Sequence, residues 1–184
     1  MRANVRVWAS TIALAVVLTT AMQACGSSVQ SSSKPHPPED FVARASDFRN
    51  LHTMTKVRGF YIDNRLGHLD EAIAVANSPD GGTYPVGTII QLVPQEAMVK
   101  RNQGFSPKTN AWEFFELDVS AEGTVIRVRG VDDVVNRFGF NCAACHADAD
   151  PKFDFVCETD HGCAPLPVGH EFFEMIQESD PRPL

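Results

Sequence analysis

The sequence is poor in basic residues, and it shows no internal repeat. Its 184 residues include 16 Lys and Arg against 23 Asp and Glu, which gives a formal net charge of −7. No basic stripe or cluster is present, so the chain lacks the charge pattern of a nucleic-acid-binding protein. The acidic balance suits solubility, and it would also attract a basic redox partner protein.

Cysteine is scarce as well, with five in the whole chain. Two of them lie in Cys142-Ala-Ala-Cys145-His146, and C-x-x-C-H is the attachment signature of a c-type haem. Two thiols about one helical turn apart add to the two vinyl groups of one porphyrin, and the adjacent histidine becomes the proximal iron ligand. The sequence therefore predicts one covalent haem c, with Cys142 and Cys145 holding the porphyrin and His146 binding the iron. A single such motif argues against a multihaem cytochrome.

Two other interpretations of this motif stay open. Cys142 and Cys145 could bind zinc together with Cys157 and Cys163, but tetrahedral zinc knuckles favour two closely spaced cysteine pairs. Five residues separate the second pair here. A redox dithiol would need a preceding βαβ unit, and the segment before Cys142 does not resemble the end of such a strand.

The N-terminus resembles an export signal. Arg2 and Arg6 precede an uncharged, apolar stretch over residues 7–24, the arrangement of a secretory signal peptide. Ala21-Met-Gln-Ala24-Cys25-Gly26 then resembles a bacterial lipobox, in which Cys25 becomes the lipidated first residue. An uncleaved membrane span is the alternative.

This N-terminal pattern predicts the domain organisation and the location. Residues 1–24 form a lipoprotein signal peptide, residues 25–40 a Ser- and Pro-rich flexible tether, and residues 41–184 the haem domain. The protein would be lipid-anchored to a membrane of the bacterial cell envelope and face the periplasm. Because that compartment is oxidising, Cys157 and Cys163 are expected to form a disulfide.

Hydrophobic periodicity indicates an α+β fold, with a small antiparallel β-sheet, flanking helices and the haem on a C-terminal C-x-x-C-H helix. The adjacent Phe114 and Phe115 break strict alternation, which allows a buried strand or a bulge. In the strand that follows, alternation places Arg127 and Arg129 on one face. Helices are predicted at residues 39–54, 68–76, 141–146 and 171–177. Strands are predicted at residues 59–62, 86–93, 111–119 and 124–129.

Three motifs, in this order, resemble the cytochrome P-460 family and its relative cytochrome c′-beta. They are Tyr84-Pro-Val-Gly87-Thr88-Ile-Ile90, Asn110-Ala-Trp112-Glu-Phe114-Phe115 and the C-x-x-C-H motif. The resemblance spans roughly residues 45 to 160. It implies a small antiparallel sheet with helices, a homodimer, and a haem whose distal side is open or weakly occupied.

The chain departs from the hydroxylamine-oxidising members of that family at one position. In those members a lysine shortly after Gly-Thr crosslinks to the porphyrin, and Leu92 stands there in this sequence, while the nearest lysine is Lys100. The expected function is a membrane-anchored periplasmic monohaem c-type cytochrome that transfers electrons or binds a diatomic gas such as NO or CO. The alternative is an oxidoreductase acting on hydroxylamine or another small nitrogen compound.

Further side chains are candidates for the surroundings of the haem, each with ordinary packing or solvation as its alternative. Arg127 and Arg129 could pair with the haem propionates. Candidate sixth ligands of the iron are His161, His170, Met98 and Met175. Candidate aromatic walls of a distal pocket are Phe60, Tyr61, Trp112, Phe114 and Phe115.

Overall fold

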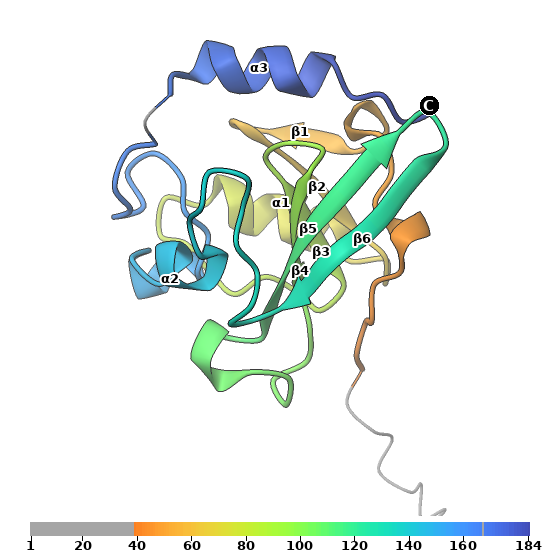
Figure 1. Ribbon diagram of the computed structural model, residues 1–184. Coiled ribbons are helices and arrows are strands. Elements are labelled where there is room, and N and C mark those ends of the chain that lie inside the picture. Colours follow the sequence, from red (N-terminus) through yellow and green to blue (C-terminus); the bar gives the residue numbers. More distant parts are fainter. Residues whose placement is uncertain (1–38, 167) are drawn as a thin grey trace, which may run out of the picture. The chain divides into compact units, whose positions relative to one another are not determined.

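A six-stranded antiparallel sheet forms the centre of the computed structural model, which describes residues 39–166 and 168–184 (Figure 1). Each strand pairs with its neighbours in chain order, so the sheet is a simple meander. This architecture confirms the predicted α+β class with an antiparallel sheet. The strands are β1 (Thr55–Val57), β2 (Phe60–Asn64), β3 (Thr88–Gln91), β4 (Glu96–Lys100), β5 (Trp112–Ser120) and β6 (Gly123–Gly130).

Three short α-helices accompany the sheet in the described residues. The helix α1 (Leu69–Asn77) joins β2 to β3, α2 (Cys142–His146) contains the C-x-x-C-H motif, and α3 (His170–Glu178) follows near the C-terminus. All three begin and end within two residues of their predicted bounds. Four 3₁₀ helices complete the fold: η1 (Ala45–Asp47), η2 (Leu51–Thr53), η3 (Pro107–Thr109) and η4 (Pro151–Phe153).

The helix predicted at residues 39–54 was wrong. This segment forms only η1 and η2, with non-helical backbone between them. Asn50 explains the interruption: its side chain accepts a hydrogen bond from His52 N and donates one of 2.6 Å to Arg182 O. A side chain that bonds to nearby and distant backbone in this way competes with the helical pattern. Phe48 and Leu51 still bury their side chains, as their spacing indicated.

The two faces of the sheet support two separate apolar clusters. The face that includes Phe114 packs with α1 and with Cys142 and Ala143 of α2, and we call it the α2 face. The opposite face, which includes Phe115, is covered by the N-terminal segment around Phe48. Because successive strand residues point to opposite faces, Phe114 and Phe115 belong to different clusters although both are buried.

A bulge between Glu116 and Leu117 shifts the pairing of β5 with β6. The predicted irregularity of β5 is therefore real, and it changes the faces of the two arginines on β6. Arg127 pairs with Glu116 at 2.8 Å and Arg129 with Glu113 at 2.7 Å. Those two glutamates lie on opposite faces of β5, so the prediction that Arg127 and Arg129 share one face was wrong.

The N-terminal end of the described chain is held to the domain. Arg101 donates hydrogen bonds to both carboxylate oxygens of Asp40, and Asn102 N donates a third. Those bonds from Arg101 lower the pKa of Asp40 to about 2. Asp40, assigned to the tether by sequence, thus contacts the folded domain. The predicted signal peptide and Cys25 lie outside the described residues, among which no helix is long and apolar enough to cross a membrane.

Candidate haem-attachment site

The helix α2 brings the two cysteines of the motif one turn apart. Its N-cap is Asn141, whose side-chain oxygen accepts a hydrogen bond of 2.9 Å from Ala144 N. Cys142 N donates to Val134 O, which ties the start of the helix to the preceding loop. Neither Cys142 nor Cys145 is bonded to another cysteine. The local sequence therefore builds the thiol spacing that a porphyrin with two vinyl groups requires.

The surroundings of both thiols favour the protonated form, although Cys145 is exposed. Burial, aided by the charges of Glu96 and Glu116, raises the pKa of Cys142 to about 12, and burial also raises the pKa of Cys145. Reactive redox cysteines have a depressed pKa, because the thiolate is the nucleophile. This environment argues against the dithiol interpretation of the motif.

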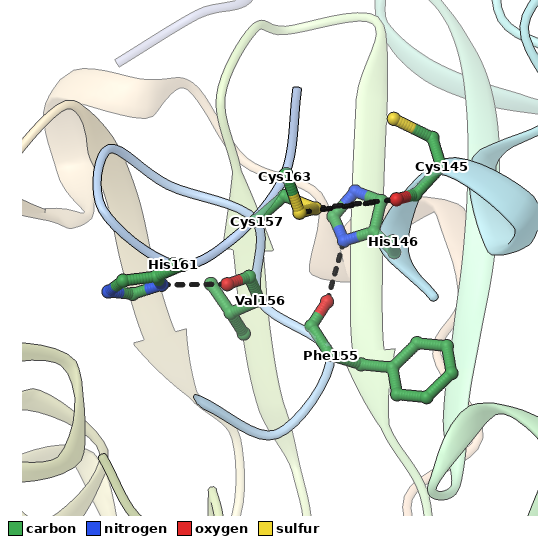
Figure 2. The surroundings of a disulfide bond; sticks show 7 residues. All are labelled: Cys145, His146, Phe155, Val156, Cys157, His161 and Cys163. Atoms are coloured by element: carbon green, nitrogen blue, oxygen red, sulfur yellow. Dashed lines mark hydrogen bonds between the residues drawn. A yellow bond between two sulfur atoms is a disulfide. The ribbon is translucent and has the colours of Figure 1, made fainter. Parts of the chain in front are cut away.

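His146 is oriented by one hydrogen bond. Its Nδ1 lies 2.7 Å from Phe155 O (Figure 2). A carbonyl oxygen only accepts, so Nδ1 carries the proton and Nε2 keeps its lone pair. Burial lowers the pKa of His146, which keeps the imidazole neutral. A neutral imidazole with one nitrogen fixed by a carbonyl is the usual form of a metal-binding histidine.

The carbonyl that orients His146 comes from an unusual piece of backbone. Asp154 and Phe155 both have positive φ angles, 53° and 68°. This left-handed conformation costs about 1–2 kcal/mol per non-glycine residue, so other contacts must maintain it. One is a hydrogen bond of 2.6 Å from Trp112 Nε1 to Asp154 O.

The side chain of Asp154 is the second anchor of this segment. It forms an ion pair with Lys100 at 2.8 Å, and the two side chains are 2 % and 1 % exposed. Tyr84 N donates to Asp154 Oδ2 at 2.8 Å, and Asn110 Nδ2 donates to Oδ1. Burial lowers the pKa of Lys100 and raises that of Asp154, while their mutual attraction opposes both shifts.

The structure also places the two residues that bear on a lysine crosslink. Leu92 is partly buried against the α2-face cluster, to which Cys142 belongs. The amine of Lys100 is bound by Asp154 and by Asn110 O. Neither position therefore presents a free amine.

Cys157 and Cys163 form a disulfide, in agreement with the predicted pairing. Their sulfur atoms lie 3.5 and 4.0 Å from the carbonyl oxygen of Cys145, so the bridge packs directly on α2 (Figure 2). A four-cysteine zinc site would need both as free thiolates. Within residues 39–166 and 168–184 no group of three or more His, Cys, Asp or Glu side chains is arranged to hold a metal ion.

Of the four candidate sixth ligands, Met98 alone belongs to the apolar cluster of the α2 face. His161 is buried, with Nδ1 2.7 Å from Val156 O and its ring stacked on Phe153 at 3.6 Å. His170 lines a cleft with Arg58, Glu158 and Phe173 (among others), and Met175 on α3 is 61 % exposed.

The predicted aromatic pocket is divided by the sheet. Phe60, Trp112 and Phe114 belong to the α2-face cluster, and the Phe114 ring lies 5.1 Å from that of His146. Tyr61, adjacent to Phe60 on β2, points to the other face, as Phe115 does. Of the five, Tyr61 and Phe115 were therefore wrongly assigned to the same wall.

A pair of acidic residues near Cys142 was missed by sequence reasoning. Glu96 on β4 is opposite Glu116 on β5, and Glu116 is fully buried. Burial and the charge of Glu116 raise the pKa of Glu96 to about 7. Only the strand register brings the two together, and no local signal in the sequence reveals it.

This pair predicts a pH-dependent stability. A carboxyl whose pKa rises from 4.5 to about 7 on folding destabilises the fold increasingly as the pH rises between those values. We expect the free energy of unfolding to fall by at most about 3 kcal/mol across this range, and Glu96→Gln to remove most of that fall. Urea unfolding between pH 5 and 8 measures it. Glu122→Gln, on the exposed turn after β5, is the control, and equal pH profiles for both variants would contradict the assignment.

No protein-family model, curated protein or solved structure matches this chain. The resemblance to cytochrome P-460 therefore rests on the three sequence motifs alone. The donor set fits a covalent haem: two thiols one turn apart that form no disulfide, a histidine whose Nδ1 is bonded to a carbonyl so that Nε2 keeps its lone pair, and an apolar cluster beside them.

Proposed function

We propose that this protein is a membrane-anchored, periplasm-facing monohaem c-type cytochrome. Cys142 and Cys145 would hold one haem c, and His146 Nε2 would bind its iron. The observation that carries the proposal is the hydrogen bond from His146 Nδ1 to Phe155 O, because it fixes the tautomer and the orientation of the residue that follows the two thiols. The bound haem would supply an iron centre able to exchange electrons and to bind small ligands.

The more specific function that we propose is the binding of a diatomic gas such as NO or CO, together with electron transfer to a partner protein. Support comes from the scarcity of competing ligands: the His161 ring is buried and stacked on Phe153, and Met175 is largely exposed. Phe114 contributes an apolar wall beside His146. The redox partner we propose is basic, in keeping with the net charge of −7.

The test is the visible spectrum of protein made with the cytochrome c maturation machinery. We expect a c-type pyridine haemochrome, a high-spin ferrous spectrum and ready binding of CO and NO, since no strong ligand has to be displaced. Peptide mapping should find the porphyrin joined to Cys142 and Cys145 only. A six-coordinate low-spin spectrum that ignores CO would instead establish a plain electron carrier, with Met98 the first candidate for the ligand.

An oxidoreductase of hydroxylamine or another small nitrogen compound is the second candidate. The observation in its favour is Glu96, whose pKa of about 7 suits a group that accepts a proton near neutral pH. Against it stands Leu92 in place of the crosslinking lysine. We expect slow or no turnover of hydroxylamine, and steady turnover with a third covalent link to the porphyrin would favour the enzyme.

The anchor and the assembly state belong to the same proposal. Metabolic labelling with palmitate should mark the wild-type protein and not Cys25→Ala, and the mature chain should begin at Cys25. An unlipidated mature N-terminus would contradict the lipobox interpretation. We also propose a homodimer, which the family resemblance implies and sedimentation of the purified protein would detect.

A further inference from the structure

The contacts around Asp154 connect the buried core to the histidine of the haem motif. Asp154 directly precedes Phe155, whose carbonyl oxygen lies 2.7 Å from His146 Nδ1. We propose that the buried Lys100–Asp154 ion pair positions that carbonyl and thereby sets the strength of the bond between His146 and the iron. The proposal rests on the proposed function, because it needs His146 as the iron ligand. Lys100 and Asp154 are positioning residues in it, since neither contacts the imidazole.

The backbone at this point needs an external restraint. Two consecutive residues, Asp154 and Phe155, hold positive φ angles without being glycine. Such a conformation persists only where surrounding contacts determine it. Relaxation of either φ angle would rotate the peptide group that contains the Phe155 carbonyl. Without those contacts this oxygen would therefore turn away from His146.

The restraint comes from three separate segments of the chain. Lys100 Nζ lies 2.8 Å from both carboxylate oxygens of Asp154, and it also donates to Asn110 O at 2.6 Å. Tyr84 N donates to the Asp154 carboxylate, and Trp112 Nε1 donates to its main-chain oxygen. Side chain and backbone of Asp154 are thus both fixed.

Tyr84, Asn110 and Trp112 are members of the motifs on which the family resemblance rests. They are distant along the chain, and they converge on one aspartate next to the haem motif. A buried ion pair is a weak source of net stability, because removing two charges from water opposes their attraction. Its effect here is geometric: both charges are satisfied in one arrangement only.

The expected consequence lies in the electronic properties of the imidazole. A hydrogen bond donated by Nδ1 raises the basicity of Nε2, and loss of such a partner typically weakens metal binding by 10- to 100-fold. If the Phe155 carbonyl moves, the iron–histidine bond should weaken. Ligands that compete with the proximal histidine, NO above all, should then displace it more easily.

The test is the double variant Lys100→Met/Asp154→Ala of the haem-loaded protein, which removes the pair and leaves the net charge unchanged. Resonance Raman spectroscopy of the ferrous form should show the iron–histidine stretch at lower frequency. Displacement of the histidine by NO should be roughly 10- to 100-fold faster.

A matched control comes from a second buried ion pair. Asp180 and Arg182 are 0 % and 2 % exposed, and Asp180 also accepts a hydrogen bond from a main-chain amide, that of Leu51. Asp180→Ala/Arg182→Met should therefore disturb the core to a similar extent and leave both haem measurements unchanged. Equal shifts in the two double variants would overturn the proposal, since they would reflect general loosening.

A milder variant decides the question if the first double variant does not fold. Trp112→Phe removes the hydrogen bond to Asp154 O together with part of a fully buried ring system, and it keeps one aromatic ring in place. We expect a smaller shift of the iron–histidine stretch in the same direction. An unchanged stretch in this variant, with the haem covalently attached, would overturn the positioning role alone. A wild-type protein without covalent haem would overturn the proposed function and the inference with it.

Discussion

Replacing Cys142 and Cys145 together by serine is expected to abolish covalent haem attachment. Serine hydroxyls do not form the thioether links that the two thiols make with the vinyl groups of the porphyrin. Any haem still bound through His146 would be held by one coordinate bond. After denaturation and acid-acetone extraction, the wild-type chain should keep all of its haem and the double variant none. Free extraction of haem from the wild type would contradict the attachment.

The second cysteine pair provides the control for this experiment. Cys157→Ser/Cys163→Ser removes the disulfide that packs on the Cys145 carbonyl, at a cost of about 2 kcal/mol on a chain-entropy model. This variant should be less stable and should still carry covalent haem. The comparison separates the loss of two particular thiols from a general loss of cysteine. Loss of haem in this control would instead show that attachment also depends on the disulfide that packs on α2.

Replacing Lys100 alone should have the largest effect on stability. Lys100→Met leaves the Asp154 carboxylate charged and buried without its cation, and breaking a buried pair in this way typically costs about 3–5 kcal/mol. Removing both charges in Lys100→Met/Asp154→Ala should cost less, because no unpaired charge remains. Urea unfolding at pH 7 measures both, and a double variant that is less stable than the single one would refute this account.

The pH dependence of the single variant provides an internal check. Burial already raises the pKa of Asp154 in the wild-type chain, and loss of the lysine should raise it further. A carboxyl group whose pKa is higher in the folded than in the unfolded protein destabilises the fold only at a pH above its pKa in the unfolded state. Below that pH the group is protonated in both states. The defect of Lys100→Met should therefore shrink as the pH falls from 7 to 4. A defect independent of pH would indicate lost packing instead of an unpaired charge.

The sequence predicted those parts of the fold that local patterns determine. Alternation and a turn signal located the hairpin of β5 and β6, because its two strands are adjacent in the chain. The sequence did not predict the strand β4, because the charged residues Glu96 and Lys100 are not typical of a strand in the middle of a sheet. The helix expected at residues 39–54 was replaced by 3₁₀ turns through bonds between Asn50 and the C-terminal segment, which no local pattern reveals.

The candidate site divides in the same way. Spacing alone identified Cys142, Cys145 and His146 as neighbours, because they lie within one helical turn. The partner of His146 is a main-chain oxygen, and every residue has one, so composition gives no clue to it. Lys100 was noticed in the sequence only as the nearest lysine to Leu92. A buried lysine needs an acidic partner, and the sequence does not indicate which of 23 acidic residues supplies it.

The chain-order meander has a consequence for how the protein matures. Each of the six strands pairs only with strands next to it along the chain, so the last strand pairing is complete at Gly130. Contacts between segments close in sequence form quickly, since little loop entropy is lost in making them. The haem motif begins twelve residues later, at Cys142. In the export that we propose, which starts from the N-terminus, all six strands would emerge before Cys142 and Cys145, so the sheet could form before haem attachment begins.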